Sequence, residues 1–195
     1  MLQDKFKNKK ILLASQSPRR QELLKGLDID FEIVKIEADE SFPSHLVREE
    51  ITEFISKNKS DAYENLHPNE ILITADTLVW LDNEMLGKPK DYLEAVEMLK
   101  NLSDSTHEVF TSVTIRSLTD SQTFSEATEV SFDSISDEEI HHYLKTYKPF
   151  DKAGAYGIQD WLGYAKISKI SGCYYNVMGL PLRKLYLHLK DLGRE

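Results

Sequence analysis

The apolar residues of this 195-residue chain follow two spacings, alternation along short runs and a three-to-four-residue repeat along longer ones. Alternating or continuous apolar runs predict strands, whereas the longer repeat predicts amphipathic helices. Strands are therefore expected at residues 10–14, 31–36, 71–81, 107–118, 123–132 and 165–170. Helices are expected after Ser17 and at residues 47–66, 91–102, 136–148 and 180–192.

Residues that start or stop helices stand at the ends of these segments. Ser17 offers a capping hydroxyl and Pro18 suits a first helical turn, whereas Lys148-Pro149 ends the helix before it. Strands and helices alternate in the first half, and a β-hairpin around residues 119–121 follows later. The pattern favours an α/β fold, a mixed sheet with flanking helices and a cleft. One domain is expected over residues 1–195, because no repeat or flexible linker interrupts the chain.

Composition removes several classes of function. No run of about 18 apolar residues occurs, and the apolar stretch after the polar N-terminus is short, so we expect a cytoplasmic protein that does not bind membranes. The single cysteine, Cys173, excludes an internal disulfide and a cysteine-built zinc site. The net charge of −9 argues against a nucleic-acid-binding surface, but a few gathered cations could still hold a small anion.

The first candidate for chemistry lies where a strand meets a helix, at Ser15, Ser17, Arg19 and Arg20. Free N–H groups at a helix start favour anions, hydroxyls can donate to phosphate oxygens, and arginine adds a planar fork of donors. The segment lacks the GxxxxGK[ST] pattern of a Walker loop. The alternative interpretation is a capped surface helix with two solvated arginines.

Carboxylates form the second candidate. Asp76 interrupts a strongly apolar strand, where a charge is unfavourable unless a partner compensates it, and it could bind a metal ion or take a proton from water. Glu37, Asp39 and Glu40 precede a helix that carries lysines, and carboxylate oxygens suit magnesium. The alternatives are an aspartate bound to local backbone and a solvated acidic loop.

Two glycine-containing segments complete the candidates. Lys88 lies between Gly87 and Pro89, which restrict the direction of the lysine. Residues 152–159 contain small residues that allow a ligand to approach the backbone, and Gln159 offers the donor and acceptor needed to read a base edge. A structural turn would explain the glycines but not the whole segment.

Taken together and in order, these segments resemble the Maf family of nucleoside triphosphate pyrophosphatases. The matching motifs are LASQSPRRQELL, ITADTLVW, GKP, DKAGAYGIQ and NVMGLPL, and the resemblance runs from Ile11 to about Leu182. It implies a Maf/ITPase-like fold with two lobes around a central cleft. It also implies an enzyme that uses Mg²⁺ or Mn²⁺ while water attacks the α-phosphorus and pyrophosphate leaves.

The resemblance also implies roles for individual residues. Asp76 matches the proton acceptor, and Asp76 and Glu40 are the expected metal ligands. Lys59 fits the functional lysine of its helix better than its rival Lys57, although Ser60 stands where alanine is usual. The expected substrate-binding residues are Ser15, Ser17, Arg19, Arg20, Lys59, Thr77, Lys88 and Gln159.

The base preference follows from a subset of these positions. Arg19, Thr77 and Gln159 fit the subfamily that resembles a dTTP and UTP pyrophosphatase, although Asp160 replaces the glycine that commonly follows the glutamine. The alternatives are an enzyme for 7-methyl-GTP or another modified nucleotide, and a nucleotide-binding regulator of septum formation. Homodimers are common in the family, so a homodimer is among the expected assemblies.

Overall fold

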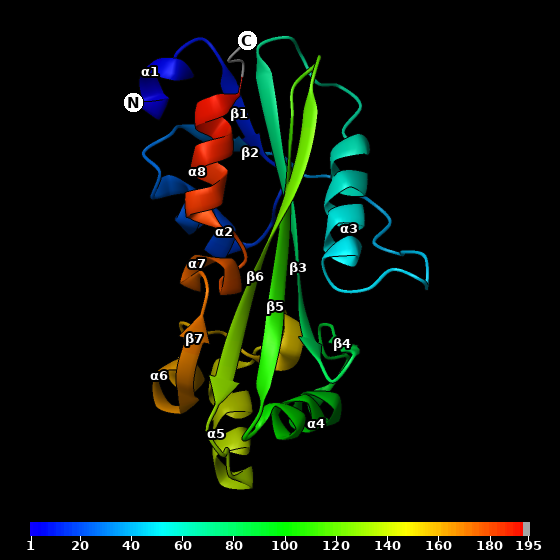
Figure 1. Cartoon of the computed structure of the whole chain (residues 1–195), viewed down its shortest axis with the longest axis vertical. Coiled ribbons are helices and arrows are strands. Elements are labelled where there is room, and N and C mark those ends of the chain that lie inside the picture. Colours follow the sequence, from blue (N-terminus) through cyan, green and yellow to red (C-terminus); the bar gives the residue numbers. More distant parts are fainter. Residues whose placement is uncertain (193–195) are drawn as a thin grey trace. The chain divides into compact units, whose positions relative to one another are not determined.

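A computed structural model describes residues 1–192 of the chain, and within them seven strands form one mixed sheet (Figure 1). The strand order is β2-β1-β3-β5-β6-β7, with β4 paired to the far end of β3. β1 pairs in parallel with both β2 and β3, whereas β4 and β7 pair antiparallel with their neighbours. The predicted mixed α/β sheet with flanking helices is confirmed.

The strands are β1 (Lys10–Leu13), β2 (Phe31–Ile33), β3 (Glu70–Leu81), β4 (Glu84–Leu86), β5 (Thr106–Arg116), β6 (Ser121–Phe132) and β7 (Ile167–Ser171). The α-helices are α1 (Leu2–Lys5), α2 (Pro18–Lys25), α3 (Glu49–Asp61), α4 (Tyr92–Leu102), α5 (Asp137–Tyr147), α6 (Trp161–Lys166), α7 (Tyr174–Val177) and α8 (Leu182–Asp191). A short 3-10 helix, η1, covers Ala153–Ala155.

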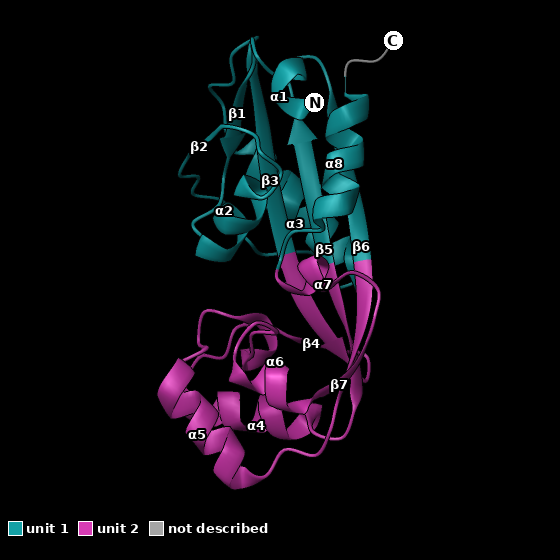
Figure 2. Ribbon diagram, turned by 90° about the vertical axis from the view of Figure 1, so that its left-hand side faces the viewer, with its two compact units in different colours: residues 1–76, 111–126, 179–195 teal, residues 77–110, 127–178 magenta. Residues whose placement is uncertain are grey.

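The chain divides into two compact units, coloured separately in Figure 2. Unit 1 contains residues 1–76 and 111–126 and the chain from Gly179 onward, and unit 2 contains residues 77–110 and 127–178. The strands β3, β5 and β6 each pass from one unit to the other, so neither unit is a continuous stretch of sequence. The predicted cleft between two lobes stays a prediction.

In unit 1, helices α3 and α8 cover opposite faces of the sheet, as the alternation of β6 side chains requires. His188 of α8 stacks on Phe124, with ring centroids 3.9 Å apart. The neighbouring residue Ser125 points the other way, toward α3, where it donates a hydrogen bond to Glu53. Figure 1 shows the same arrangement, with α3 and α8 on either side of the long strands.

Unit 2 has its own apolar core and its own helix caps. Ser136 and Glu139 form a reciprocal capping box at the start of α5, as the Ser-x-x-Glu spacing requires. Lys148 adopts a left-handed conformation directly before Pro149 and ends the helix where the sequence predicts. The core is built mainly from α4, α5 and the ends of the long strands, and includes Val79, Leu99, Val130, Phe132, Ile140, Leu144 and Leu162.

Several predicted boundaries are wrong. The strand expected from residue 165 begins only at Ile167, because Ala165 belongs to α6. The predicted helix over 47–66 is shortened to α3, and the predicted strand over 31–36 is shortened to β2. Strand β4 and the short helices α1, α6 and α7 have too few residues to show a repeat in the sequence.

No helix within residues 1–192 is long and apolar enough to cross a membrane.

Candidate functional site

The loop between β1 and α2 is fixed by its own serines. The buried Ser15 hydroxyl accepts a hydrogen bond from the Ser17 N–H at 3.2 Å, and the Ser17 hydroxyl accepts one from the Arg20 N–H at 3.5 Å. Ser17 is thus the N-cap of α2, and Pro18 occupies the first turn as predicted. The loop therefore presents two hydroxyls at a helix start, where an anion is favoured.

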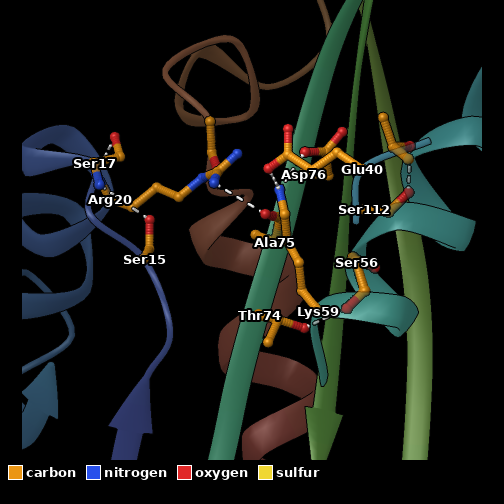
Figure 3. Close-up of polar contacts among 12 residues, drawn as sticks. Ser15, Ser17, Arg20, Glu40, Ser56, Lys59, Thr74, Ala75, Asp76 and Ser112 are labelled. Atoms are coloured by element: carbon orange, nitrogen blue, oxygen red, sulfur yellow. Dashed lines mark hydrogen bonds and ion pairs between the residues drawn. The ribbon is translucent and has the colours of Figure 1, made fainter. Parts of the chain in front are cut away.

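Arg20 connects this loop to strand β3 (Figure 3). Its Nε donates to the Gly179 carbonyl at 2.7 Å, and its Nη1 donates to the Ala75 carbonyl at 2.9 Å. Burial lowers the pKa of the guanidinium, and the nearby Asp76 opposes that change. Arg20 is therefore a partly buried cation that holds the backbone next to Asp76, and its predicted contact with substrate stays a prediction.

Strand alternation sets the direction of Asp76. Thr74 points toward α3, since its hydroxyl donates to the Ser56 carbonyl at 2.6 Å, and Asp76 lies two residues further on the same face. The Lys59 ammonium of α3 lies 2.8 Å from Asp76 Oδ1 and 2.8 Å from Glu40 Oε1. Figure 3 shows both carboxylates at the tip of this lysine.

This ion-pair cluster of Glu40, Lys59 and Asp76 lies within unit 1 and combines burial with access. The side chains of Lys59 and Asp76 are each 16% exposed, whereas Glu40 is 54% exposed. The cation compensates the unfavourable burial of the Asp76 carboxylate, as the sequence requires of a charge inside an apolar strand. The neighbouring Lys57 is exposed, and the structure gives it no comparable partner among the described residues.

The carboxylates of the cluster fit a divalent cation. Magnesium typically takes one or two protein carboxylates and completes its shell with water and substrate phosphates. Asp76 and Glu40 supply two such groups around one point, the Lys59 ammonium. No group of three or more His, Cys, Asp or Glu suited to a metal occurs among residues 1–192.

A ladder of hydroxyls, which the sequence analysis missed, fixes α3 to the sheet beside this cluster. Thr52 meets Ser112 at 2.6 Å, and Ser56 meets Thr114 at 2.9 Å. Hydrogen bonds at 2.9 Å continue from β5 to Ser125 and Thr123 of β6. The signal in the sequence is a four-residue repeat of hydroxyl side chains along α3 opposite alternating hydroxyls on β5.

The other two predicted segments meet in unit 2. The Gly154 N–H donates to the Gly87 carbonyl at 3.1 Å, which joins η1 to the loop that carries Lys88. Gly154 has a φ of 66°, and a Cβ there would lie 3.1 Å from Val79, so both conformation and space favour glycine. The exposed Lys88 and the half-buried Gln159 thus lie on segments held to each other by backbone.

The remaining predicted residues lie at defined places in the two units. Thr77 follows Asp76 on β3 and is half-buried at the start of unit 2, whereas Arg19 is half-buried in the first turn of α2. The Oε1 atom of Gln159 is buried, and no hydrogen-bond partner for it exists among the described residues. The structure therefore gathers Ser15, Ser17, Arg20, Glu40, Lys59 and Asp76 in unit 1, and Lys88 and Gln159 in unit 2.

One family profile and several relatives match nearly the whole chain. The sequence profile of the family described as "Maf-like protein" matches residues 10–192. A "dTTP/UTP pyrophosphatase" of Flavobacterium psychrophilum is 53% identical over 97% of both chains. One of Bacteroides thetaiotaomicron is 50% identical over 93% of this chain and 95% of its own. The solved Ham1 protein of Staphylococcus aureus is a remote likeness, with a TM-score of 0.46 and 15% identity over 64% of this chain and 72% of that chain.

Proposed function

The chain belongs to the Maf-like protein family, and we propose that it hydrolyses dTTP and UTP to the nucleoside monophosphate and pyrophosphate. The observation that carries this proposal is the match to relatives named dTTP/UTP pyrophosphatase, at about half identity over nearly the full chain. The pairing of a strand carboxylate with a lysine beside a serine-rich helix start supports it, because phosphoanhydride hydrolysis needs a proton acceptor and cations.

In the proposed reaction, water attacks the α-phosphorus, and the bond from that phosphorus to the bridging oxygen of the pyrophosphate breaks. Asp76 takes the proton of the attacking water, and Lys59 keeps the carboxylate in place through the 2.8 Å ion pair. The hydroxyls of Ser15 and Ser17 and the cations Arg19, Arg20 and Lys88 would bind the phosphate chain. Such positioning and charge neutralisation are the main sources of rate in this chemistry.

A divalent ion, Mg²⁺ or Mn²⁺, belongs to the same proposal. Asp76 and Glu40, whose carboxylates each lie 2.8 Å from the Lys59 ammonium, would hold it. Its contribution would be to neutralise charge on the phosphate oxygens. Removal of metal with a chelator should abolish pyrophosphate release, and added Mg²⁺ or Mn²⁺ should restore it.

Base preference would come from Thr77 and Gln159 together with Arg19. The ring edge shared by thymine and uracil presents carbonyl acceptors beside an N–H donor. The Gln159 carboxamide offers the complementary donor and acceptor, and its buried Oε1 lacks a partner among the described residues.

A cytoplasmic location is part of the proposal, because the triphosphates of a cell are made and used there.

A product assay across a nucleotide panel tests the proposal. The chain is incubated with Mg²⁺ or Mn²⁺ and each of dTTP, UTP, CTP, the purine triphosphates and 7-methyl-GTP, and monophosphate and pyrophosphate are measured. We expect pyrophosphate release that is fastest with dTTP and UTP. Release of single orthophosphate, or no turnover of any nucleotide, would sink the proposal. Fastest turnover of 7-methyl-GTP would keep the reaction and replace the substrate.

A further inference from the structure

Gln159 lies in a tight turn of unit 2 that Gly157 and Asp160 close. The Asp160 N–H donates to the Gly157 carbonyl at 3.0 Å, so Ile158 and Gln159 are the two central residues of a β-turn. A Cβ at Gly157 would lie 2.5 Å from Asp160 Oδ2 and 3.1 Å from Gln159 Nε2. Residue 157 must therefore be glycine for both side chains to keep their places.

A buried tyrosine joins the two ends of this turn. The Tyr143 hydroxyl of α5 accepts a hydrogen bond from the Gly157 N–H at 3.0 Å and donates one to Asp160 Oδ2 at 2.9 Å. Tyr143 is fully buried, and burial together with the Asp160 charge raises the pKa of its phenol. The hydroxyl therefore keeps its proton and remains a donor to Asp160.

The Asp160 side chain does not cap the helix that follows it, although its position in the chain suggests that it would. It is the N-cap residue of α6, where an aspartate usually accepts a hydrogen bond from the first turn of the helix. Within residues 1–192, its side chain accepts no such bond, and the carboxylate accepts a hydrogen bond from the Tyr143 hydroxyl instead. Helix α6 also packs closely against the turn. A Cβ at Gly163 of this helix would collide with the Ile158 carbonyl oxygen of the turn.

We infer that Tyr143 and Asp160 are positioning residues that hold the Gln159 carboxamide in the orientation that selects the pyrimidine base. The inference rests on the proposed function, because it assigns the specificity of the same site. Both ends of the turn are tied to one hydroxyl, so the two central residues have little freedom. A fixed carboxamide discriminates between bases, because the wrong base leaves its donor or acceptor unpaired.

The experiment compares uracil with cytosine, whose base edges differ at two neighbouring positions. Uracil presents an N3–H donor and an O4 acceptor, whereas cytosine presents an N3 acceptor and an N4–H donor. Values of kcat/KM for UTP and CTP are measured in wild type, Tyr143→Phe, Asp160→Ala and Asp160→Asn. We expect wild type to favour UTP, and Tyr143→Phe and Asp160→Ala to lower the UTP-to-CTP ratio about tenfold, with kcat for UTP changed less than about threefold. Asp160→Asn retains an oxygen that accepts from Tyr143, and should keep most of the preference.

Two matched controls separate positioning from stability. Tyr156→Phe also removes a buried hydroxyl of unit 2, one that bonds to His107 at 2.7 Å outside the turn. Tyr147→Phe removes the hydroxyl of an exposed residue whose ring stacks on Tyr143. Both should keep the wild-type ratio, although Tyr156→Phe should lower the melting temperature.

Several outcomes would overturn the inference: no preference between UTP and CTP in wild type, an unchanged ratio in Tyr143→Phe and Asp160→Ala, or an equal loss in Tyr156→Phe. Dissociation constants for non-hydrolysable UTP and CTP analogues are measured in the same variants. These constants test whether the turn sets the base preference even if the protein releases no pyrophosphate. A lack of pyrophosphate release would overturn the proposed function but not this inference.

Discussion

The ammonium of Lys59 lies 2.8 Å from Asp76 Oδ1, and this contact joins helix α3 to strand β3 at the centre of the candidate site. Both side chains are largely buried, so the pair is shielded from water more than a surface ion pair. The separation of 17 residues along the chain means that the tertiary fold creates the contact. The pair keeps a charged acceptor in a largely apolar strand, as the proposed hydrolysis requires.

Substitution of the proposed proton acceptor should remove activity without removing the fold. Asp76→Asn keeps the size of the side chain but loses its basicity, so pyrophosphate release should fall at least about 100-fold, the usual scale for a lost catalytic base. Thermal unfolding followed by circular dichroism should remain cooperative. Asp82→Asn is the matched control, because Asp82 is exposed in the turn after the same strand, and its positive φ of 49° suits asparagine. Wild-type turnover in Asp76→Asn would reject the assignment.

The two lysines near the end of α3 give a second test. Lys59→Met removes the ammonium that contacts both Glu40 and Asp76, so we expect kcat/KM to fall at least about tenfold. Lys57→Met removes an exposed ammonium two residues away and should stay within about twofold of wild type. Steady-state kinetics with UTP measure both variants. Equal losses, or a larger loss in Lys57→Met, would show that the functional lysine is misassigned.

The position of Asp76 illustrates what the sequence could predict. An apolar strand with one carboxylate already indicated that a cation must compensate it, and Lys59 supplies that cation. The role of the α3 hydroxyls was missed, because Thr52 and Ser56, although they repeat on one face of the helix, look like part of a solvent-facing surface. They are fully buried, since hydroxyls of β5 meet them across the interface.

The region around Ala165 shows a secondary structure that the sequence predicted wrongly. The apolar residues of 165–170 resemble a strand, but the first two residues of that segment continue a helix of six residues. A helix this short has less than two turns, so its repeat cannot be distinguished from alternation. Likewise, the sequence indicated that Gln159 could read a base, whereas its link to Tyr143 through the turn depends on tertiary packing.

Loss of the hydrogen bond from the Thr74 hydroxyl of β3 to the Ser56 carbonyl of α3 should reduce the stability of the fold. Thr74→Val keeps the shape of the side chain but removes the donor to the buried Ser56 carbonyl, so the free energy of unfolding should fall by about 1–3 kcal/mol. Urea denaturation at constant pH measures the change. Thr123→Val is the control, because Thr123 is exposed and water can replace its bond to Thr114. If Thr74→Val lowers the free energy of unfolding no more than Thr123→Val does, the bond from Thr74 to α3 does not stabilise the fold as expected.

His107 should make the stability of the protein depend on pH. Burial lowers the pKa of this imidazole from 6.5 to about 4, and its Nε2 bonds to the Tyr156 hydroxyl while its Nδ1 has no partner among the described residues. A second proton would therefore create a buried charge with an unpaired N–H. As the pH falls below 6.5, the unfolded chain takes up this proton first, so the free energy of unfolding decreases until about pH 4.

The change should amount to about 2 kcal/mol between pH 7 and pH 5, since each unit of pKa difference corresponds to about 1.4 kcal/mol. Urea denaturation at both pH values measures it in wild type and in His107→Gln, which cannot take up the proton. The variant should lose about 2 kcal/mol less than wild type on acidification, whatever its stability at pH 7. His67→Gln, which changes an exposed histidine, is the control, and its free energy of unfolding should decrease between pH 7 and pH 5 as much as that of wild type. An equal response in wild type and His107→Gln would mean that His107 keeps an ordinary pKa in the folded chain, despite its burial against Phe132 and Tyr156.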